Sequence, residues 1–324
     1  MTKAIRVHKP GGPEVLQVED VLVGDPGPGE VKIRQHAIGL NYIDVYHRTG
    51  QYPPAAYPFI PGSEGAGEVM AVGGGVEDFA EGDRVAYAGP LGGYAQERLI
   101  DQKFLVRLPK AIGYETGAAM MLKGLTAQYL LRRTFRVKKG DTILVHAAAG
   151  GVGLILCQWA WALGATVIGT VGSAEKVGIA KKAGAKHVIN YNTQDFVARV
   201  KDITKGNLCD VVYDGVGKAT FPGSLDCLSP FGMFVNYGSA SGPIDAFNIG
   251  LLAQKGSLFA TRPTLFTYIA KRADLDKMAR ELFKAVASGD VNIPVHATWP
   301  LEDVAKAHIE LEGRKTTGAT ILIP

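Results

Sequence analysis

The stretch HAAAGGVG, residues 146–153, is the part of the sequence whose residue types and spacing most directly suggest chemistry. An apolar run, residues 142–146, predicts a strand before it, and an apolar, alanine-containing run, residues 154–163, predicts a helix after it. A glycine-rich turn between a strand and a helix lets the backbone approach an anion, which the exposed N–H groups and the positive helix end then bind. The stretch is therefore predicted to hold the pyrophosphate of a dinucleotide.

Individual positions in this turn have separate predicted roles. Gly150 and Gly151, followed by Val152, are predicted to bring the backbone up to the pyrophosphate. Gly153 is predicted to let the helix pack closely on the strand. Ala148 stands where the G-x-G-x-x-G pattern has its first glycine, so we expect a slightly wider turn. Glycines alone would also fit a flexible loop, but the flanking strand and helix favour phosphate binding.

The end of the next predicted strand, GTVGSAEK at 169–176, distinguishes between two dinucleotides. A free ribose 2′-hydroxyl usually meets an Asp or Glu at this point. The first acid here is Glu175, which would suit the start of a helix in any protein. Gly172, Ser173 and Lys176 instead offer small polar groups and a positive charge, which favours a 2′-phosphate and hence NADPH. A solvated surface lysine is the alternative interpretation of Lys176.

Six short apolar runs after residue 120 predict the sheet that would position this turn. Helical stretches separate the first four runs, and buried strands with helical crossovers indicate a doubly wound parallel sheet with both faces covered. The predicted strands are Thr142–His146, Thr166–Thr170, His187–Asn190, Asp210–Asp214, Met233–Asn236 and Ser257–Thr261.

The two ends of the chain have a different pattern. Before residue 120, short alternating runs such as Val31–His36 and Arg84–Ala88 lie between turn clusters and predict an irregular antiparallel β domain. Near the C-terminus, the sequence predicts a helix at Asp274–Ala287 and strands at Ile293–His296 and Ala319–Ile323. We expect this tail to return to the first domain, so that residues 1–122 and 263–324 form one domain and residues 123–262 the other.

Composition limits the class of protein. The 324 residues are 47% hydrophobic and 20% charged with a net charge of +4, which is ordinary for a soluble globular protein and argues against nucleic acid as the main partner. The three cysteines are far apart, as expected in a reducing compartment. No apolar run approaches the ~20 residues of a membrane span, and the N-terminus lacks the apolar core of a signal peptide. A cytoplasmic location is therefore expected.

Eight segments together make the chain resemble the zinc-independent quinone oxidoreductases of the medium-chain dehydrogenase/reductase superfamily, the group that includes zeta-crystallin. The resemblance implies a GroES-like β-rich catalytic domain built from both chain ends, an inserted six-stranded Rossmann domain, NADPH as cofactor, and a homodimer. The segments are GGPEVLQ (11–17), AIGLNYIDVYHRTGQYP (37–53), PGSEGAGEV (61–69), EGDRVAY (81–87), LKGLTAQYLL (122–131), HAAAGGVG (146–153), VVYDGVG (211–217) and TRP (261–263).

The sequence departs from the zinc-dependent members of that superfamily. Where they have a cysteine and a histidine as zinc ligands, this chain has Asn41 in GLNYID and Ser63 in PGSEGAGEV. Glu64 remains, and we interpret it as a structural or hydrogen-bonding residue. No metal is expected. Without a Lewis acid the acceptor must already be activated, as a quinone is, or a double bond conjugated to a carbonyl.

The resemblance also implies site residues. Asn41 and Tyr52 are the candidate catalytic donors to the carbonyl oxygen that gains charge, although Tyr52 would equally fit a covering loop aromatic. Thr126 and Tyr129 are implied as cofactor contacts but would equally fit helix packing. The remaining implied cofactor contacts are Asn41, Asp44 and Tyr46 at the nicotinamide end, Tyr191 beside the adenosine phosphate, Gly238 and Ser239 after the fifth strand, and Arg314 as a second cation.

Three functional hypotheses remain open at this point. The first is an NADPH-dependent quinone reductase, and the second is an NADPH-dependent reductase of enals, enones or enoyl thioesters. The third is a non-catalytic, crystallin-like or RNA-binding role. The seven histidines form no HxH, HExxH or Ser–His–Asp pattern, and we expect none to be catalytic. His146, which ends a buried strand, is expected to be a packed histidine with its hydrogen bonds satisfied.

Overall fold

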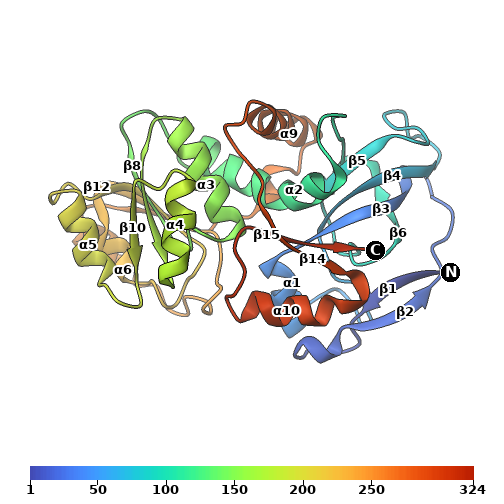
Figure 1. The fold of residues 1–324 in the computed structure, drawn as a ribbon, viewed down its shortest axis with the longest axis horizontal. Helices are drawn as coiled ribbons and strands as arrows, with labels where there is room; N and C mark the ends of the chain where they lie inside the picture. Colours follow the sequence, from blue (N-terminus) through green and yellow to red (C-terminus); the bar gives the residue numbers. More distant parts are fainter. The chain divides into compact units, whose positions relative to one another are not determined.

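The structure is a computed structural model that describes all residues from Met1 to Pro324 (Figure 1). It divides into two compact units. The β-rich unit contains Met1–Leu125, Ile269–Phe283 and Ile293–Pro324, and the parallel-sheet unit contains Thr126–Tyr268 and Lys284–Asn292. No helix combines the length and the apolar composition needed to cross a bilayer.

The parallel-sheet unit is built on six parallel strands in the order β10-β9-β8-β11-β12-β13, which confirms the predicted doubly wound sheet. The strand order reverses between β8 and β11, the position at which such sheets bind ligands at the carboxyl ends of their strands. The strands are β8 (Thr142–Val145), β9 (Thr166–Val171), β10 (His187–Asn190), β11 (Cys209–Asp214), β12 (Leu228–Asn236) and β13 (Phe259–Thr261).

Helices cover both faces of this sheet, with α3 and α4 on one face and α5 and α6 on the other (Figure 1). Consecutive residues of β8, from Ile143 to Val145, are fully buried, as expected for a strand covered on both sides. The helices of this unit are α3 (Gly151–Ala162), α4 (Ala174–Lys182), α5 (Phe196–Ile203), α6 (Gly223–Asp226), α7 (Gly250–Gln254) and α8 (Leu265–Tyr268).

The β-rich unit holds a seven-stranded sheet and a two-stranded sheet. The larger sheet has the order β14-β15-β3-β4-β5-β7, with β6 paired to β3, and β15 runs antiparallel to β3. The C-terminal segment thus completes the sheet of the N-terminal segment. The strands are β1 (Thr2–Arg6), β2 (Gln17–Val21), β3 (Glu30–Leu40), β4 (Glu64–Val72), β5 (Arg84–Ala88), β6 (Glu97–Asp101), β7 (Leu105–Arg107), β14 (Val295–Pro300) and β15 (Ala319–Ile323).

One core cluster of this unit joins apolar side chains from both ends of the chain, among them Ile5, Ile38, Val304 and Leu322. Burial of such side chains stabilises the fold by about 1.5–3 kcal/mol each. The helices of the unit and its borders are α1 (Tyr42–Thr49), α2 (Tyr114–Tyr129), α9 (Arg272–Ala287) and α10 (Val304–Glu312), with 3₁₀ turns at Pro13–Val15, Gln102–Phe104 and Leu301–Asp303.

Several predicted boundaries were wrong. The sequence around Glu115–Arg133 predicts one helix, but the chain is α-helical from Tyr114 to Tyr129 and continues as a π-helical turn, Leu130–Thr134. The strand expected at Ile293–His296 begins after Pro294, which has no N–H to pair, and runs to Pro300. The fifth parallel strand begins at Leu228 instead of Met233, because Leu228 already pairs with Cys209 before an irregularity in the register.

Candidate functional site

The glycine-rich turn joins β8 to α3 and is closed tightly. Ala147 adopts a left-handed backbone with φ of +52°, and its carbonyl accepts a hydrogen bond from the N–H of Gly150 at 2.9 Å. The N–H of Ala148 donates to the carbonyl of Thr170 on β9, also at 2.9 Å. Ala147 thus takes the left-handed conformation that a glycine often supplies. The slightly wider turn expected from Ala148 stays a prediction.

Gly150 and Gly153 have different surroundings in this turn. A Cβ on Gly153 would lie 2.3 Å from the carbonyl oxygen of Ala147, so only glycine lets α3 begin this close to β8. A Cβ on Gly150 would meet only that same oxygen, at 3.2 Å, and open space otherwise. Gly153 is therefore needed for packing, whereas Gly150 leaves room beside the turn.

The first turn of α3 presents hydrogen-bond donors without helical acceptors. The N–H of Leu154 makes the first bond of the helix, to the carbonyl of Gly150 at 2.9 Å. The N–H groups of Gly151, Val152 and Gly153 precede that bond and have no acceptor within the helix. Together with the positive end of a 12-residue helix, they form a suitable site for a phosphate group.

The end of β9 brings three predicted residues together. A Cβ on Gly172 would lie 2.6 Å from the hydroxyl oxygen of Tyr191, so the phenol ring lies directly against this glycine. Ser173 is the N-cap of α4, and its hydroxyl is hydrogen-bonded to Glu175, which lowers the pKa of that carboxyl with a further contribution from Lys176. Glu175, which the sequence placed at the start of a helix, thus contacts Ser173 directly. The assignment of this group to a 2′-phosphate stays a prediction.

A buried polar network supports the turn from the neighbouring strand. The carboxylate of Asp214, at the end of β11, accepts hydrogen bonds from the N–H groups of Val216 and Gly217 at 2.8 and 3.0 Å. It also accepts from the hydroxyls of Thr220 and Ser224 at 2.6 and 2.9 Å. The loop after β11 is therefore fixed by its own strand end. A second loop packs against it, because a Cβ on the predicted site residue Gly238 would lie 2.7 Å from the carbonyl oxygen of Gly215.

His146 belongs to the same network. Its ring nitrogens lie 2.9 Å from the hydroxyl of Thr170 and 3.1 Å from that of Ser224, and its side chain is fully buried. Burial lowers the pKa of His146, so the ring is neutral at physiological pH. The expected packed, hydrogen-bonded histidine is confirmed. Sequence reasoning nevertheless missed that Asp214, Ser224 and His146 meet in space, with the serine in the middle and no solvent access.

The remaining predicted residues of the parallel-sheet unit are largely buried. Tyr129 stacks on Tyr268 with ring centroids 4.3 Å apart and is only 2% exposed. Thr126 and Ser239 are each 7% exposed. Packing therefore accounts for Tyr129 and Thr126 at least as well as cofactor contact, and both assignments stay predictions.

In the β-rich unit, the predicted residue Asn41 belongs to a buried polar cluster. The Asn41 amide donates one hydrogen to Glu64 Oε2 at 2.7 Å and the other to the carbonyl of Gly39 at 3.2 Å. Glu64 also forms an ion pair with Lys123 at 2.9 Å and accepts from the N–H of Leu122 at 2.7 Å. The expected hydrogen-bonding role of Glu64 is confirmed, whereas Lys123 was missed by sequence reasoning.

Within this cluster the ammonium group of Lys123 balances the charge of the Glu64 carboxylate. Glu64 and Lys123 are both buried, at 0% and 5% exposure, so their charges attract each other in surroundings with little water. No three His, Cys, Asp or Glu side chains gather closely enough to hold a metal ion. The cation beside Glu64 is therefore supplied by the chain itself.

The other predicted residues of this unit gather on α1. Asp44 and Tyr46 are buried on that helix. The N–H of Tyr52 donates to the carbonyl of Tyr46 at 3.0 Å, and the two rings make an edge contact with centroids 5.0 Å apart. The structure thus brings Tyr52 to the helix that carries Asn41 and Asp44. Arg314 is an exposed residue after α10, and its assignment stays a prediction.

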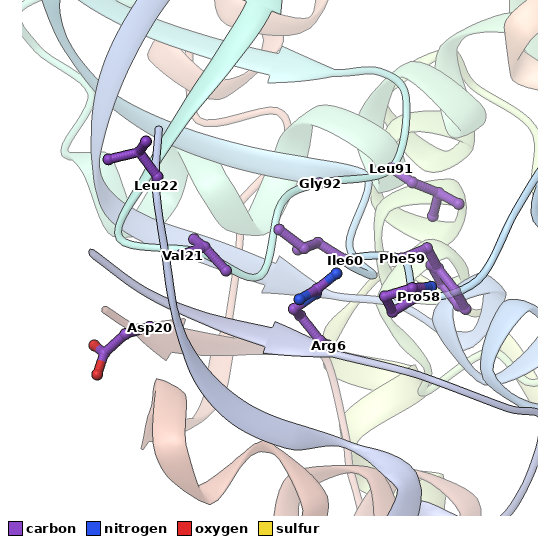
Figure 2. Close-up of a pocket in the computed structure, with 9 residues that line it drawn as sticks. All are labelled: Arg6, Asp20, Val21, Leu22, Pro58, Phe59, Ile60, Leu91 and Gly92. Carbon is purple, nitrogen blue, oxygen red and sulfur yellow. The ribbon is translucent and has the colours of Figure 1, made fainter. Parts of the chain in front are cut away.

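A hollow of about 640 Å³ lies beside the β1–β2 hairpin but contains none of the predicted site residues. Figure 2 shows Arg6 among Pro58, Phe59, Ile60 and Leu91. The guanidinium of Arg6 is already paired with Glu19 at 3.0 Å. We therefore do not assign this hollow to the candidate site.

Two family models match the chain. The alcohol dehydrogenase GroES-like domain matches residues 27–134, and the zinc-binding dehydrogenase model matches residues 151–284. Among curated proteins, the quinone oxidoreductase of Pseudomonas aeruginosa is 51% identical, with both chains covered completely. The 2-haloacrylate reductase of a Burkholderia species is 47% identical, covering 100% of this chain and 99% of its own.

Solved structures of quinone oxidoreductases are also similar to this chain. The quinone oxidoreductase of Pseudomonas syringae superposes with a TM-score of 0.98 at 51% identity, with both chains covered completely. The quinone oxidoreductase of Escherichia coli complexed with NADPH superposes with a TM-score of 0.98 at 49% identity, covering 99% of this chain and 100% of its own.

Proposed function

The chain belongs to the quinone oxidoreductases of the medium-chain dehydrogenase/reductase superfamily, and from that premise we propose that it is an NADPH-dependent reductase of quinones. The observation that carries the proposal is the turn between β8 and α3. Its three N–H groups without helical acceptors and the open space beside Gly150 fit a pyrophosphate. The Escherichia coli relative in complex with NADPH supports the same cofactor for this chain.

When bound, NADPH supplies the hydride. We propose that Gly150, Gly151 and Val152 hold its pyrophosphate, since their backbone borders the open side of the turn. The group around Ser173 would hold the 2′-phosphate. We further propose the remaining contacts from the family resemblance: Asn41, Asp44, Tyr46, Thr126, Tyr129, Gly172, Lys176, Tyr191, Gly238, Ser239 and Arg314.

The acceptor needs a hydrogen-bond donor at the carbonyl oxygen that gains charge. We propose the hydroxyl of Tyr52 for this role. Asn41 can add a second donor only by giving up its longer bond, at 3.2 Å to the carbonyl of Gly39, because the shorter one is held by a buried carboxylate. Glu64 would therefore orient Asn41 during the reaction.

We propose that the reaction needs no metal. The support is chemical: Glu64 is the one residue retained from the zinc-ligand segments, and the Lys123 ammonium already neutralises it. A zinc ion at this carboxylate would have to displace that ammonium from a buried site.

Reduction of activated double bonds is the second candidate function. It is favoured by the 47% identity to a 2-haloacrylate reductase over the whole chain. Both reactions place a hydride on an electron-poor carbon and charge on an oxygen, so the same residues would serve either acceptor.

The test is steady-state turnover with NADPH across a panel of quinones, 2-alkenals, 2-haloacrylates and enoyl thioesters, with a strong chelator present throughout. We expect quinones to give the highest kcat/KM. The matched control is Gly150→Val, which should keep the fold and abolish cofactor binding because its branched side chain enters the open space beside the turn. Higher kcat/KM for an alkene would select the second candidate, and loss of activity with chelator would contradict metal independence.

We also propose a cytoplasmic homodimer. The three cysteines are free and buried, as expected in a reducing compartment. The outer edge of β13 has no partner strand, and exposed apolar side chains occur on or near the strands at this end of the sheet: Phe231, Phe247, Ile249 and Phe259. Such an edge is suited to pairing with a second copy.

A further inference from the structure

A continuous chain of buried hydrogen bonds connects Asp44 on α1 to Glu312 on α10. Asp44 Oδ2 accepts from the hydroxyl of Tyr94 at 2.8 Å, and that hydroxyl lies 3.1 Å from Nε2 of His308. Nδ1 of His308 lies 3.0 Å from the guanidinium of Arg48, which makes two bonds to the Glu312 carboxylate at 2.6 and 2.9 Å. Only Glu312 reaches solvent appreciably, with 31% of its side chain exposed.

The direction of every bond in this chain is fixed. Arg48 has only donors, so Nδ1 of His308 must accept and the neutral ring carries its hydrogen on Nε2. That hydrogen is donated to the oxygen of Tyr94, whose own hydrogen is donated to Asp44. Burial and the nearby Arg48 lower the pKa of His308 to about 3, so the ring does not gain a second proton near neutral pH. Burial and Asp44 raise the pKa of Tyr94, so the phenol keeps its hydrogen.

These hydrogen bonds act on the carboxyl group of Asp44. Its Oδ2 also accepts from the backbone N–H of Asn41 at 2.8 Å, while its Oδ1 is buried without a partner. The pKa of Asp44 is raised to about 7, mainly by burial and in smaller part by the nearby Glu64. The bonds from Tyr94 and Asn41 and the charge of Lys123 oppose this rise. These groups are the ones that decide whether the carboxylate is ionised.

Ionised Asp44 holds the start of α1. As the third residue of the helix, it forms a capping box with Asn41, the N-cap residue. A protonated carboxyl accepts hydrogen bonds more weakly than a carboxylate does. Protonation therefore loosens the backbone of Asn41, whose side chain is fixed separately by Glu64.

We infer that Tyr94, His308 and Arg48 are positioning residues that keep Asp44 ionised against the backbone of Asn41. They thereby set the pH below which kcat/KM of the protein falls. The inference rests on the proposed function, because Asn41 is one of its candidate donors. It assigns a role to three residues outside the proposed binding and catalytic set.

The test compares Tyr94→Phe with Tyr87→Phe. Both changes remove a buried phenol hydroxyl from the same unit, but Tyr87 donates to Gln35, at 2.5 Å, and not to Asp44. Two quantities are measured against pH: the ¹³Cγ resonance of Asp44, assigned with Asp44→Asn, and kcat/KM with NADPH and a quinone. The NMR measurement needs no turnover, and its spectrum reports whether each variant is folded.

In the wild type, both quantities should titrate with a midpoint near the pKa of about 7. Tyr94→Phe should raise both midpoints by about 1–2 pH units, because one hydrogen bond to the charged form is lost. Tyr87→Phe should leave both midpoints in place. Asp44→Asn, whose side chain is neutral at every pH, should show no acid limb and should give a low kcat/KM over the whole range.

An unmoved Asp44 resonance in folded Tyr94→Phe would overturn the inference. A resonance that moves while the kcat/KM midpoint does not would overturn it equally. If the protein shows no turnover but the titration midpoint of Asp44 still rises in Tyr94→Phe, the effect of Tyr94 on Asp44 is supported and the proposed function is overturned instead.

Discussion

Ala148 and Gly169 form a complementary pair beside the phosphate-binding turn. A Cβ on Gly169 would lie 2.7 Å from the Cβ of Ala148, so the methyl group at 148 fits only because β9 has a glycine opposite it. The glycine missing from the G-x-G-x-x-G pattern is thus compensated 21 positions later, as the difference between 148 and 169 gives. No local pattern in the sequence indicates this pairing.

We predict that Gly169→Ala lowers the free energy of unfolding by about 1–3 kcal/mol through overpacking. Adding Ala148→Gly to that variant should recover much of the loss, although Ala148→Gly alone should be destabilising. Urea unfolding of the two single variants and the double variant measures the coupling. Gly178→Ala is the matched control: its Cβ meets nothing within 4 Å in the interior of α4, so it should stabilise the protein slightly. Strictly additive effects of the first pair would contradict the contact.

The choice of cofactor is tested at Lys176. Removing its charge with Lys176→Ala should raise the dissociation constant of NADPH roughly 10- to 150-fold and leave that of NADH nearly unchanged. Glu175→Gln should act in the opposite direction, because the carboxylate bonded to Ser173 would otherwise repel a phosphate at the same hydroxyl. Fluorescence titration with both cofactors measures these constants. Equal weakening of NADPH and NADH by Lys176→Ala would mean that the lysine supports the fold.

Elements differed in how well the sequence predicted them. Runs such as 142–146 and 187–190 were placed within one residue, because consecutive apolar residues between turns have few alternative structures. The predicted strand Met233–Asn236 left out the segment LSPFG at 228–232. Phe231 in that segment does have φ of +63°, but Leu228 pairs with Cys209 in the sheet. The site was predicted where one local segment forms it, as at 150–153. It was missed where distant residues meet, as Lys123 does with Glu64.

The buried hydrogen bonds that run from Asp44 on α1 to Glu312 on α10 have a predicted effect on the free energy of unfolding. The pKa of His308 is about 3 in the folded chain and about 6.5 unfolded, so acidification below pH 6.5 protonates only the unfolded state and destabilises the fold. The pKa of Asp44 is about 7 folded and near 4 unfolded, so acidification from pH 7 to 4 protonates only the folded state and stabilises it. The two effects oppose each other between about pH 4 and 6.5.

We therefore predict that His308→Gln, which removes one of the two effects, gains stability relative to the wild type on acidification. The gain should be about 1.4 kcal/mol for each pH unit below 6.5. Asp44→Asn should lose stability relative to the wild type over the same range. Urea unfolding at pH 4.5, 5.5 and 6.5 measures both. A pH-independent difference between His308→Gln and the wild type would show that His308 titrates normally in the folded chain.

At the scale of the whole molecule, the unpaired edge of β13 predicts how copies associate. Phe259 on that strand is 57% exposed, and Phe259→Lys places a charge where a second copy would pack. We expect the variant to be a folded monomer when the wild type is a dimer, as measured by sedimentation velocity. Trp161→Lys is the control, since this 65% exposed residue lies on α3, away from the edge strand. A dimer that persists in Phe259→Lys would place the interface elsewhere.

The antiparallel pairing of β15 with β3 also has a consequence for synthesis on the ribosome. Leu322 pairs with Ile38, so the Ile38–Leu40 end of β3 acquires its neighbour on this side only when residues 320–322 emerge, whereas β6 already pairs with the Glu30–Arg34 end. At a synthesis rate of roughly 5–20 residues per second, β15 is made on the order of 14–60 s after β3. All six strands of the parallel sheet, by contrast, are complete once Thr261 has left the exit tunnel. The nascent chain therefore carries an unpaired strand edge at Ile38–Leu40 until β15 is made, and an unpaired strand edge is suited to pairing with another chain.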